Sequence, residues 1–142
     1  MKPKPDKPDS DFSADAETWL QWAEQSHAGA HALFNNGNSS LWFPAAILGH
    51  QALEMFLKAA LIKQGRGVVR GDAWGHNLVD LASELAKTGF HFPSGFVDDL
   101  KTFNEFFEEL RNPHPARKVQ ELGSMEGVLL DYLAKILKGA IR

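Results

Sequence analysis

Residues 41–63 read LWFPAAILGHQALEMFLKAALIK, and this stretch decides the fold. Apolar residues recur along it at steps of three and four, the spacing of one helical face, and further apolar residues occupy much of the remaining circumference. A helix that is apolar on most sides belongs at the centre of a helical bundle. Ser40 is the expected N-cap of this helix, and Pro44 falls in its first turn, where a missing N–H costs little.

The same helical spacing continues on both sides of this central stretch, and no segment shows a sustained strand pattern. The sequence therefore predicts an all-α, up-and-down bundle of four to five helices. The further helices are expected over residues 14–35 with Ser13 as the N-cap, from Leu78 to a stop at Gly89, from Phe96 to Pro113 and Pro115, and over about 122–140.

Composition sets the class of protein. The chain has 142 residues, of which 44% are hydrophobic, and it has no cysteine and a net charge of −3. One domain is expected at this length, and the missing cysteines exclude a disulfide framework, a thiolate metal site and a cysteine nucleophile. The charge argues against a wholly basic surface but allows a local basic patch. Residues 1–12 are expected to be a disordered tail and residues 13–142 the helical domain.

The location of the protein follows from the same composition. No uninterrupted apolar run reaches the roughly 18 residues of a membrane span. The first residues carry lysines without an apolar stretch behind them, which does not fit a signal peptide. We expect a soluble, cytoplasmic protein that does not bind a membrane.

One group of polar residues interrupts the apolar surface of the central helix. His50, Gln51, Glu54 and Lys58 lie on one side of it, at steps of three and four. Glu54 and Lys58 stand in the favourable order for a helical ion pair. Two interpretations remain open, namely a solvent-facing stripe that carries this pair and the lining of a ligand groove.

A second group is the basic segment 111–118, RNPHPARK, which contains no acidic residue. Arg111 in a last helical turn is stabilising on dipole grounds alone. His114 lies between two prolines that stiffen the backbone, and a stiff imidazole near Arg111, Arg117 and Lys118 suits a phosphate group.

Two other patterns carry weaker signals. His27 and His31 are four residues apart and could face one metal ion, but spacing supplies no third ligand, so two amphipathic residues at the edge of a packed face are the favoured interpretation. The glycine-rich segment 65–71 superficially resembles a phosphate loop, yet it follows a helix and lacks the Lys-Ser/Thr pair, so a connector is favoured. Neither a metal nor a cofactor is expected.

Residues 51–59, QALEMFLKA, resemble the second-helix signature of HEPN domains (higher eukaryotes and prokaryotes nucleotide-binding). The helix from Trp19 to Leu33, the triplet at 76–78 and the pair Arg111-Asn112 follow in the family's order, so the resemblance covers about residues 14–140. It implies a compact helical bundle that is often a homodimer. Many members of this family are metal-independent ribonucleases or pair with a minimal nucleotidyltransferase in toxin–antitoxin systems, and others bind nucleotides or RNA.

The resemblance also bears on activity. In nuclease members an Arg and a polar residue begin a motif that ends in His, with four to six residues between Arg and His. Arg111 and Asn112 match its start, whereas His114 leaves only two residues between. Binding of a nucleotide or RNA phosphate is therefore expected rather than catalysis. The alternatives are an endoribonuclease that uses Arg111, Asn112 and His114, and a helical interaction module without a ligand.

Together, these patterns define the expected site and assembly. We expect Glu54, Lys58 and Arg111 to share one groove, and we expect a homodimer because six Phe lie between residues 90 and 107. A nucleotidyltransferase is the expected protein partner. The candidate ligand-binding residues are Gln51, Glu54, Lys58, His76, Arg111, His114 and Arg117.

Overall fold

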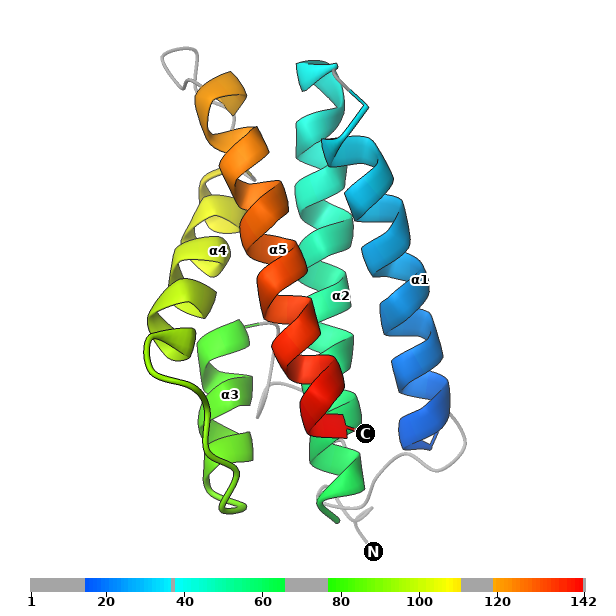
Figure 1. Ribbon diagram of the computed structural model, residues 1–142, viewed down its shortest axis with the longest axis vertical. Helices are drawn as coiled ribbons and strands as arrows, with labels where there is room; N and C mark the ends of the chain where they lie inside the picture. Colours follow the sequence, from blue (N-terminus) through cyan, green and yellow to red (C-terminus); the bar gives the residue numbers. More distant parts are fainter. Residues whose placement is uncertain (1–14, 37, 66–76, 111–118, 142) are drawn as a thin grey trace, which may run out of the picture.

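The computed structural model describes residues 15–36, 38–65, 77–110 and 119–141, and helices are the only regular secondary structure within these ranges (Figure 1). The all-α bundle predicted from the sequence is confirmed, with five α-helices in the described ranges. The elements are α1 (Ala16–Phe34), the short 3-10 helix η1 (Ser39–Leu41), α2 (Trp42–Lys63), α3 (Leu78–Ala86), α4 (Phe96–Leu110) and α5 (Val119–Ile141). The expected tail and most of the glycine-rich segment 65–71 lie outside the described residues.

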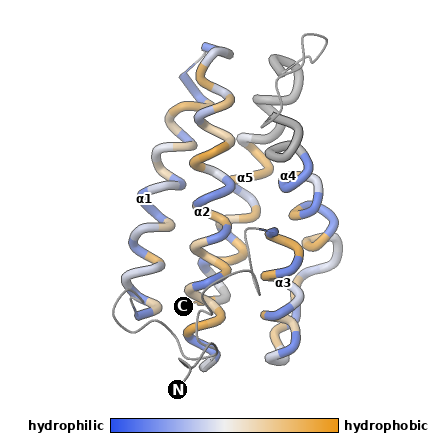
Figure 2. The backbone as a smooth tube through the Cα atoms, turned by 180° about the vertical axis from the view of Figure 1, so that it is seen from behind, coloured by the Kyte–Doolittle hydropathy of each residue, from blue (hydrophilic) through white to orange (hydrophobic). Residues whose placement is uncertain are grey.

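Helix α2 is the central element, as its apolar circumference predicts. It packs against α1, α3, α4 and α5, and Figures 1 and 2 show it between α1 on one side and α3 and α4 on the other. The length and composition of α2 would also suit a membrane span, but 72% of its most apolar 18-residue stretch is buried inside the bundle. Helix α2 is thus the core helix of a soluble domain.

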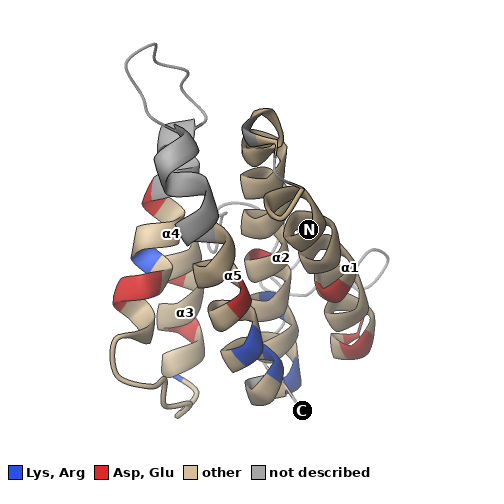
Figure 3. Ribbon diagram, turned by 45° about the horizontal axis from the view of Figure 1, so that its top comes forward, with Lys and Arg blue, Asp and Glu red and all other residues tan. Residues whose placement is uncertain are grey.

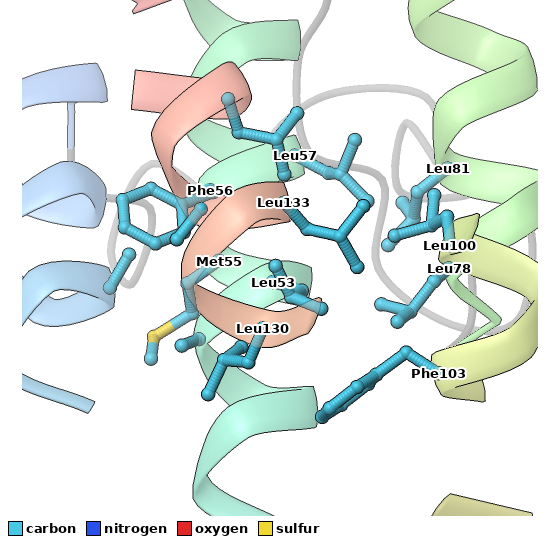
Figure 4. Packing of buried hydrophobic residues seen from close by; sticks show 14 of the residues in the cluster. Leu53, Met55, Phe56, Leu57, Leu78, Leu81, Leu100, Phe103, Leu130 and Leu133 are labelled. Atoms are coloured by element: carbon cyan, nitrogen blue, oxygen red, sulfur yellow. The ribbon is translucent and has the colours of Figure 1, made fainter. Parts of the chain in front are cut away.

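The core forms where α2 meets its neighbours (Figure 4). Leu53 and Leu57 of α2 pack with leucines of α5 on one side and with side chains of α3 and α4 on the other. Burying one such side chain contributes about 1.5–3 kcal/mol. The largest fully buried side chains are Leu53, Phe56, Leu57, Leu61, Leu78, Leu81, Leu85, Phe96, Leu100, Phe103, Leu130 and Leu133.

The start of α1 differs from the expected one. Asp15, rather than Ser13, is the N-cap, because its carboxylate accepts a hydrogen bond from the backbone N–H of Thr18 at 2.9 Å. That bond lowers the pKa of the Asp15 carboxyl. A carboxylate at this position also interacts favourably with the helix dipole, which a serine hydroxyl does not.

Helix α2 also begins differently from the prediction. The backbone N–H and the hydroxyl of Ser40 both donate to Asn38 Oδ1, at 3.0 and 2.7 Å, so the Ser40 side chain is engaged in a local turn and does not cap α2. Leu41 takes the N-cap position without a side-chain hydrogen bond. Pro44 lies in the first turn, as predicted.

The remaining helices follow the predicted order with small shifts. Asn77 caps α3 by accepting from the backbone N–H groups of Val79 and Asp80. Gly89 has a φ of +97°, a left-handed conformation that glycine adopts without strain, and it ends the turn after α3. Helix α5 begins at Val119, three residues before the predicted start.

The phenylalanine-rich segment packs within a single chain. Phe96 and Phe103 are fully buried, and the rings of Phe90 and Phe92 meet edge to face while Phe92 stacks on Phe96. The core therefore accounts for the four described phenylalanines of the six that motivated a homodimer. The homodimer itself remains a prediction.

Helices α1 and α5 approach closely at Gly127. A Cβ atom at this position would lie 3.0 Å from the Phe34 Cβ and 3.1 Å from its Cγ. The Phe34 Cβ is fixed to the backbone of α1, so only a shift of the helix would relieve this contact. Gly139, twelve residues further along α5, has no described atom within 4 Å of the same position.

We expect the same substitution at these two glycines to have opposite effects on stability. Gly139→Ala should raise the free energy of unfolding by about 0.5–1 kcal/mol, because alanine is the better helix former. Gly127→Ala should lower it by about 1 kcal/mol, because overpacking against Phe34 outweighs that gain. Urea denaturation of the two variants measures both effects, and a stabilising Gly127→Ala would show that α1 and α5 separate easily.

Candidate functional site

Three polar residues of α2 lie in a row that is largely shielded from solvent. Lys58 Nζ donates to Glu54 Oε2 at 2.8 Å, so the ion pair expected from the sequence is present. The two side chains are only 14% and 12% exposed. His50 lies one turn before Glu54 and is buried. We call His50, Glu54 and Lys58 the α2 polar row.

One end of the α2 polar row is closed by an aromatic side chain of α1. Lys58 Nζ lies 5.6 Å from the centroid of the Trp19 ring, within the range of a cation–π interaction. The Trp19 Nε1 is buried and has no hydrogen-bond partner among the described residues. Sequence reasoning did not assign Trp19 to the site, because only the packing of α1 on α2 brings it to Lys58.

The other end of the row is held by a buried asparagine of α4. Asn104 Oδ1 lies 3.2 Å from His50 Nε2 and accepts a hydrogen bond from the backbone N–H of Leu78, also at 3.2 Å. Since this oxygen is an acceptor for both groups, His50 Nε2 carries the proton. His50 Nδ1 then faces Glu54 Oε1 at 3.9 Å.

Asn104, like Trp19, was not predicted from the sequence to be part of the site. It occurs in an amphipathic stretch of α4, and nothing in its local pattern distinguishes a buried amide from an exposed one. Its two hydrogen bonds connect the start of α3 to the middle of α2. The α2 polar row thus rests on three elements besides its own helix, namely α1, α3 and α4.

Gln51 is exposed and lies outside this shielded row. The sequence groups it with His50, Glu54 and Lys58, but its position on the helix turns it further toward solvent. The other candidates, His76, Arg111, Asn112, His114 and Arg117, lie outside the described residues. The expected groove between Arg111 and the ion pair is therefore a prediction that the described residues do not test.

The basic residues of the described chain are unevenly distributed. Figure 3 shows lysines of α2 and α5 toward the end of the bundle where the C-terminus lies, a further basic residue on α4, and acidic residues on all five α-helices. Lys63 donates to the backbone carbonyl of Ile141, and Lys138 lies 3.9 Å from Glu24. These lysines therefore join helices as well as contributing positive charge.

His27 and His31 of α1 form a separate polar contact. His27 Nε2 lies 2.7 Å from Asp131 Oδ1 and His31 Nδ1 lies 2.8 Å from Asp131 Oδ2, so one carboxylate of α5 receives both rings. The described part of the chain holds no group of three or more His, Cys, Asp or Glu in a geometry that could hold a metal ion. Through these two hydrogen bonds His27 and His31 link α1 to Asp131 of α5, a contact that we call the interhelical clasp.

Comparison with known proteins supports the fold. The family model described as HEPN domain matches residues 16–128, which include the whole α2 polar row. The crystal structure of TT1696 from Thermus thermophilus is similar with a TM-score of 0.66 and 23% sequence identity, covering 88% of this chain and 97% of that chain. At this identity the similarity shows the fold alone. No curated protein matches the chain.

We expect Asn104→Leu to destabilise the protein. The change leaves the His50 Nε2–H and the Leu78 N–H without their acceptor in a buried environment, which should lower the free energy of unfolding by about 2–4 kcal/mol. Thr102→Ala, an exposed change on the same helix, should alter it by less than about 0.5 kcal/mol. Chemical denaturation measures both values, and equal stabilities would mean that the Asn104 bonds contribute nothing.

We expect the clasp to be measurable as a coupling between α1 and α5. In a double-mutant cycle of His27→Gln and Asp131→Asn, the coupling energy should be about 1 kcal/mol. The cycle with His31→Gln should give less, because the His31 side chain is 54% exposed against 15% for His27, and solvent weakens its contact. Additive effects in both cycles would contradict the clasp.

Proposed function

This chain belongs to the HEPN domain family, and from that premise we propose that it binds the phosphate of a nucleotide or of an RNA strand at the α2 polar row. The observation that carries the proposal is the shielded Glu54–Lys58 pair, bounded by Trp19 and extended by His50. The candidates His76, Arg111, His114 and Arg117 are proposed to complete the binding surface.

Stability alone is a poor explanation for this row. A charged pair that is largely removed from water gains little over apolar residues of the same size, because desolvation offsets the attraction between its charges. Helix α2 is otherwise filled with apolar side chains that would pack there. Binding of a charged ligand explains the presence of charged residues in this row, whereas a purely structural role does not.

The chemistry of Lys58 suits an oxyanion. Its ammonium group has three N–H donors, and the bond to Glu54 uses one of them. Bonds from an ammonium to phosphate oxygens are charge-assisted, and they strengthen where water is partly excluded. Glu54 fixes the position of the ammonium group, and the Trp19 ring limits its movement from the α1 side.

The wider assembly is part of the same proposal. We propose a cytoplasmic homodimer that acts as the helical component of a toxin–antitoxin-like pair with a nucleotidyltransferase. The support for this assembly is membership of the family rather than a contact in the described residues. Binding is proposed rather than cleavage, because the Arg111 to His114 spacing departs from the nuclease pattern.

We expect removal of the ion pair to weaken phosphate recognition without unfolding the protein. In Glu54→Gln/Lys58→Gln both side chains keep their approximate size and the net charge is unchanged. Affinity for a fluorescein-labelled RNA oligonucleotide should fall about ten- to a hundredfold, as expected for the loss of a charge-assisted hydrogen bond. The matched control is Glu84→Gln/Lys87→Gln on α3, where Lys87 is well exposed, and it should bind like the wild type. Fluorescence anisotropy in EDTA at low and high salt measures the affinities.

The same experiment separates the alternatives. Wild-type affinity should fall steeply as salt rises, because phosphate contacts release counterions. No salt-dependent binding by the wild type would contradict the proposal and favour an interaction module without a ligand. Cleavage of the RNA in EDTA that is lost in His114→Ala would instead identify an endoribonuclease.

A further inference from the structure

Helix α2 exposes two large apolar side chains on the face that leads to its polar row. Phe43 is 42% exposed and Ile47 is 40% exposed, although most of α2 is buried. Gln51, four residues after Ile47, is also exposed. Steps of four place Phe43, Ile47 and Gln51 on one face of the helix, one above the other.

The chemical character of this face changes in a regular order. Two apolar side chains come first, an exposed amide follows, and the Glu54–Lys58 pair comes last. Phe43 and Lys58 are fifteen residues apart, which is about 22 Å along the helix at about 1.5 Å per residue. Even from Ile47 to Lys58 the separation is about 16 Å. One nucleotide cannot contact both ends of this face.

This order matches the parts of a single-stranded nucleic acid. A base has an apolar π face that stacks on aromatic side chains, and its edge carries donors and acceptors that a glutamine amide can pair with. The backbone carries the phosphate that Lys58 suits. We propose that Phe43 and Ile47 form a nucleobase subsite, so that the preferred ligand is a single strand of more than one nucleotide. This inference rests on the proposed function.

A second copy of the chain fits this face less well. A stable interface buries about 800 Å² per partner and has an apolar core. Phe43 and Ile47 are the only large exposed hydrophobic residues in the part of α2 that the structure describes, and each is already more than half covered. Two such side chains bordered by Gln51 and an ion pair are a small apolar area, on the scale of one or two bases.

The test compares strands with and without bases. The probes are a fluorescein-labelled oligouridylate of about six nucleotides and a labelled abasic ribose-phosphate oligomer of equal length, with unlabelled AMP as a competitor. The variants are Phe43→Ala and Phe43→Tyr, and the control is Tyr132→Ala, which removes a similarly exposed aromatic ring from α5. Circular dichroism confirms folding, and light scattering measures the oligomeric state.

We expect the wild type to bind the oligouridylate about tenfold or more tightly than the abasic oligomer, as stacking of one base predicts. Phe43→Ala should remove this preference, and Phe43→Tyr and Tyr132→Ala should keep it. AMP should compete weakly with the oligouridylate.

Two results would overturn the subsite while leaving phosphate binding intact. One is equal affinity for the two oligomers, and the other is a base preference that survives in folded Phe43→Ala. A change from dimer to monomer in Phe43→Ala, with unchanged RNA affinity, would assign the face to a second copy instead. Absence of salt-dependent binding to either oligomer would contradict the proposed function itself.

Discussion

The need to bury α2 on nearly all sides governs this structure. A helix with apolar residues around most of its circumference cannot rest on a single neighbour, because one packed face would leave the others in water. Helices α1, α3, α4 and α5 all contact it, and the largest buried side chains lie along these contacts. On one side α2 is covered by the short α3 and by the phenylalanine-rich segment at the start of α4, where Phe92 stacks on Phe96.

The polar residues of α2 depend on that same burial. His50, Glu54 and Lys58 lie where the surrounding helices shield the surface of α2 from most of the solvent, and each has a partner. Asn104 on α4 is the partner of His50, and Trp19 on α1 adds a contact to Lys58. A ligand that contacts this row would therefore meet side chains whose positions are fixed by the packing of the whole bundle, and such preorganisation favours affinity and selectivity.

Helices α1 and α5 meet through a different set of contacts. Gly127 allows the Phe34 side chain to approach the α5 backbone, and the clasp of His27 and His31 on Asp131 adds directed hydrogen bonds along the same interface. Close approach and directed bonds together fix how α5 lies against α1.

The sequence by itself determined the helical class, the order of the helices and the central place of α2, because these follow from local spacing and from the apolar circumference of one segment. It also determined the Glu54–Lys58 pair, since partners four residues apart meet on any helix. It misplaced the caps of α1 and α2, because Ser13, Asp15 and Ser40 are all capable of capping and only the local turn selects among them. The tertiary structure alone decided that Asn104 supports His50, that Trp19 borders Lys58 and that Asp131 receives His27 and His31. These partners lie far apart in the sequence, and their meeting depends on how the helices pack, which no local pattern records.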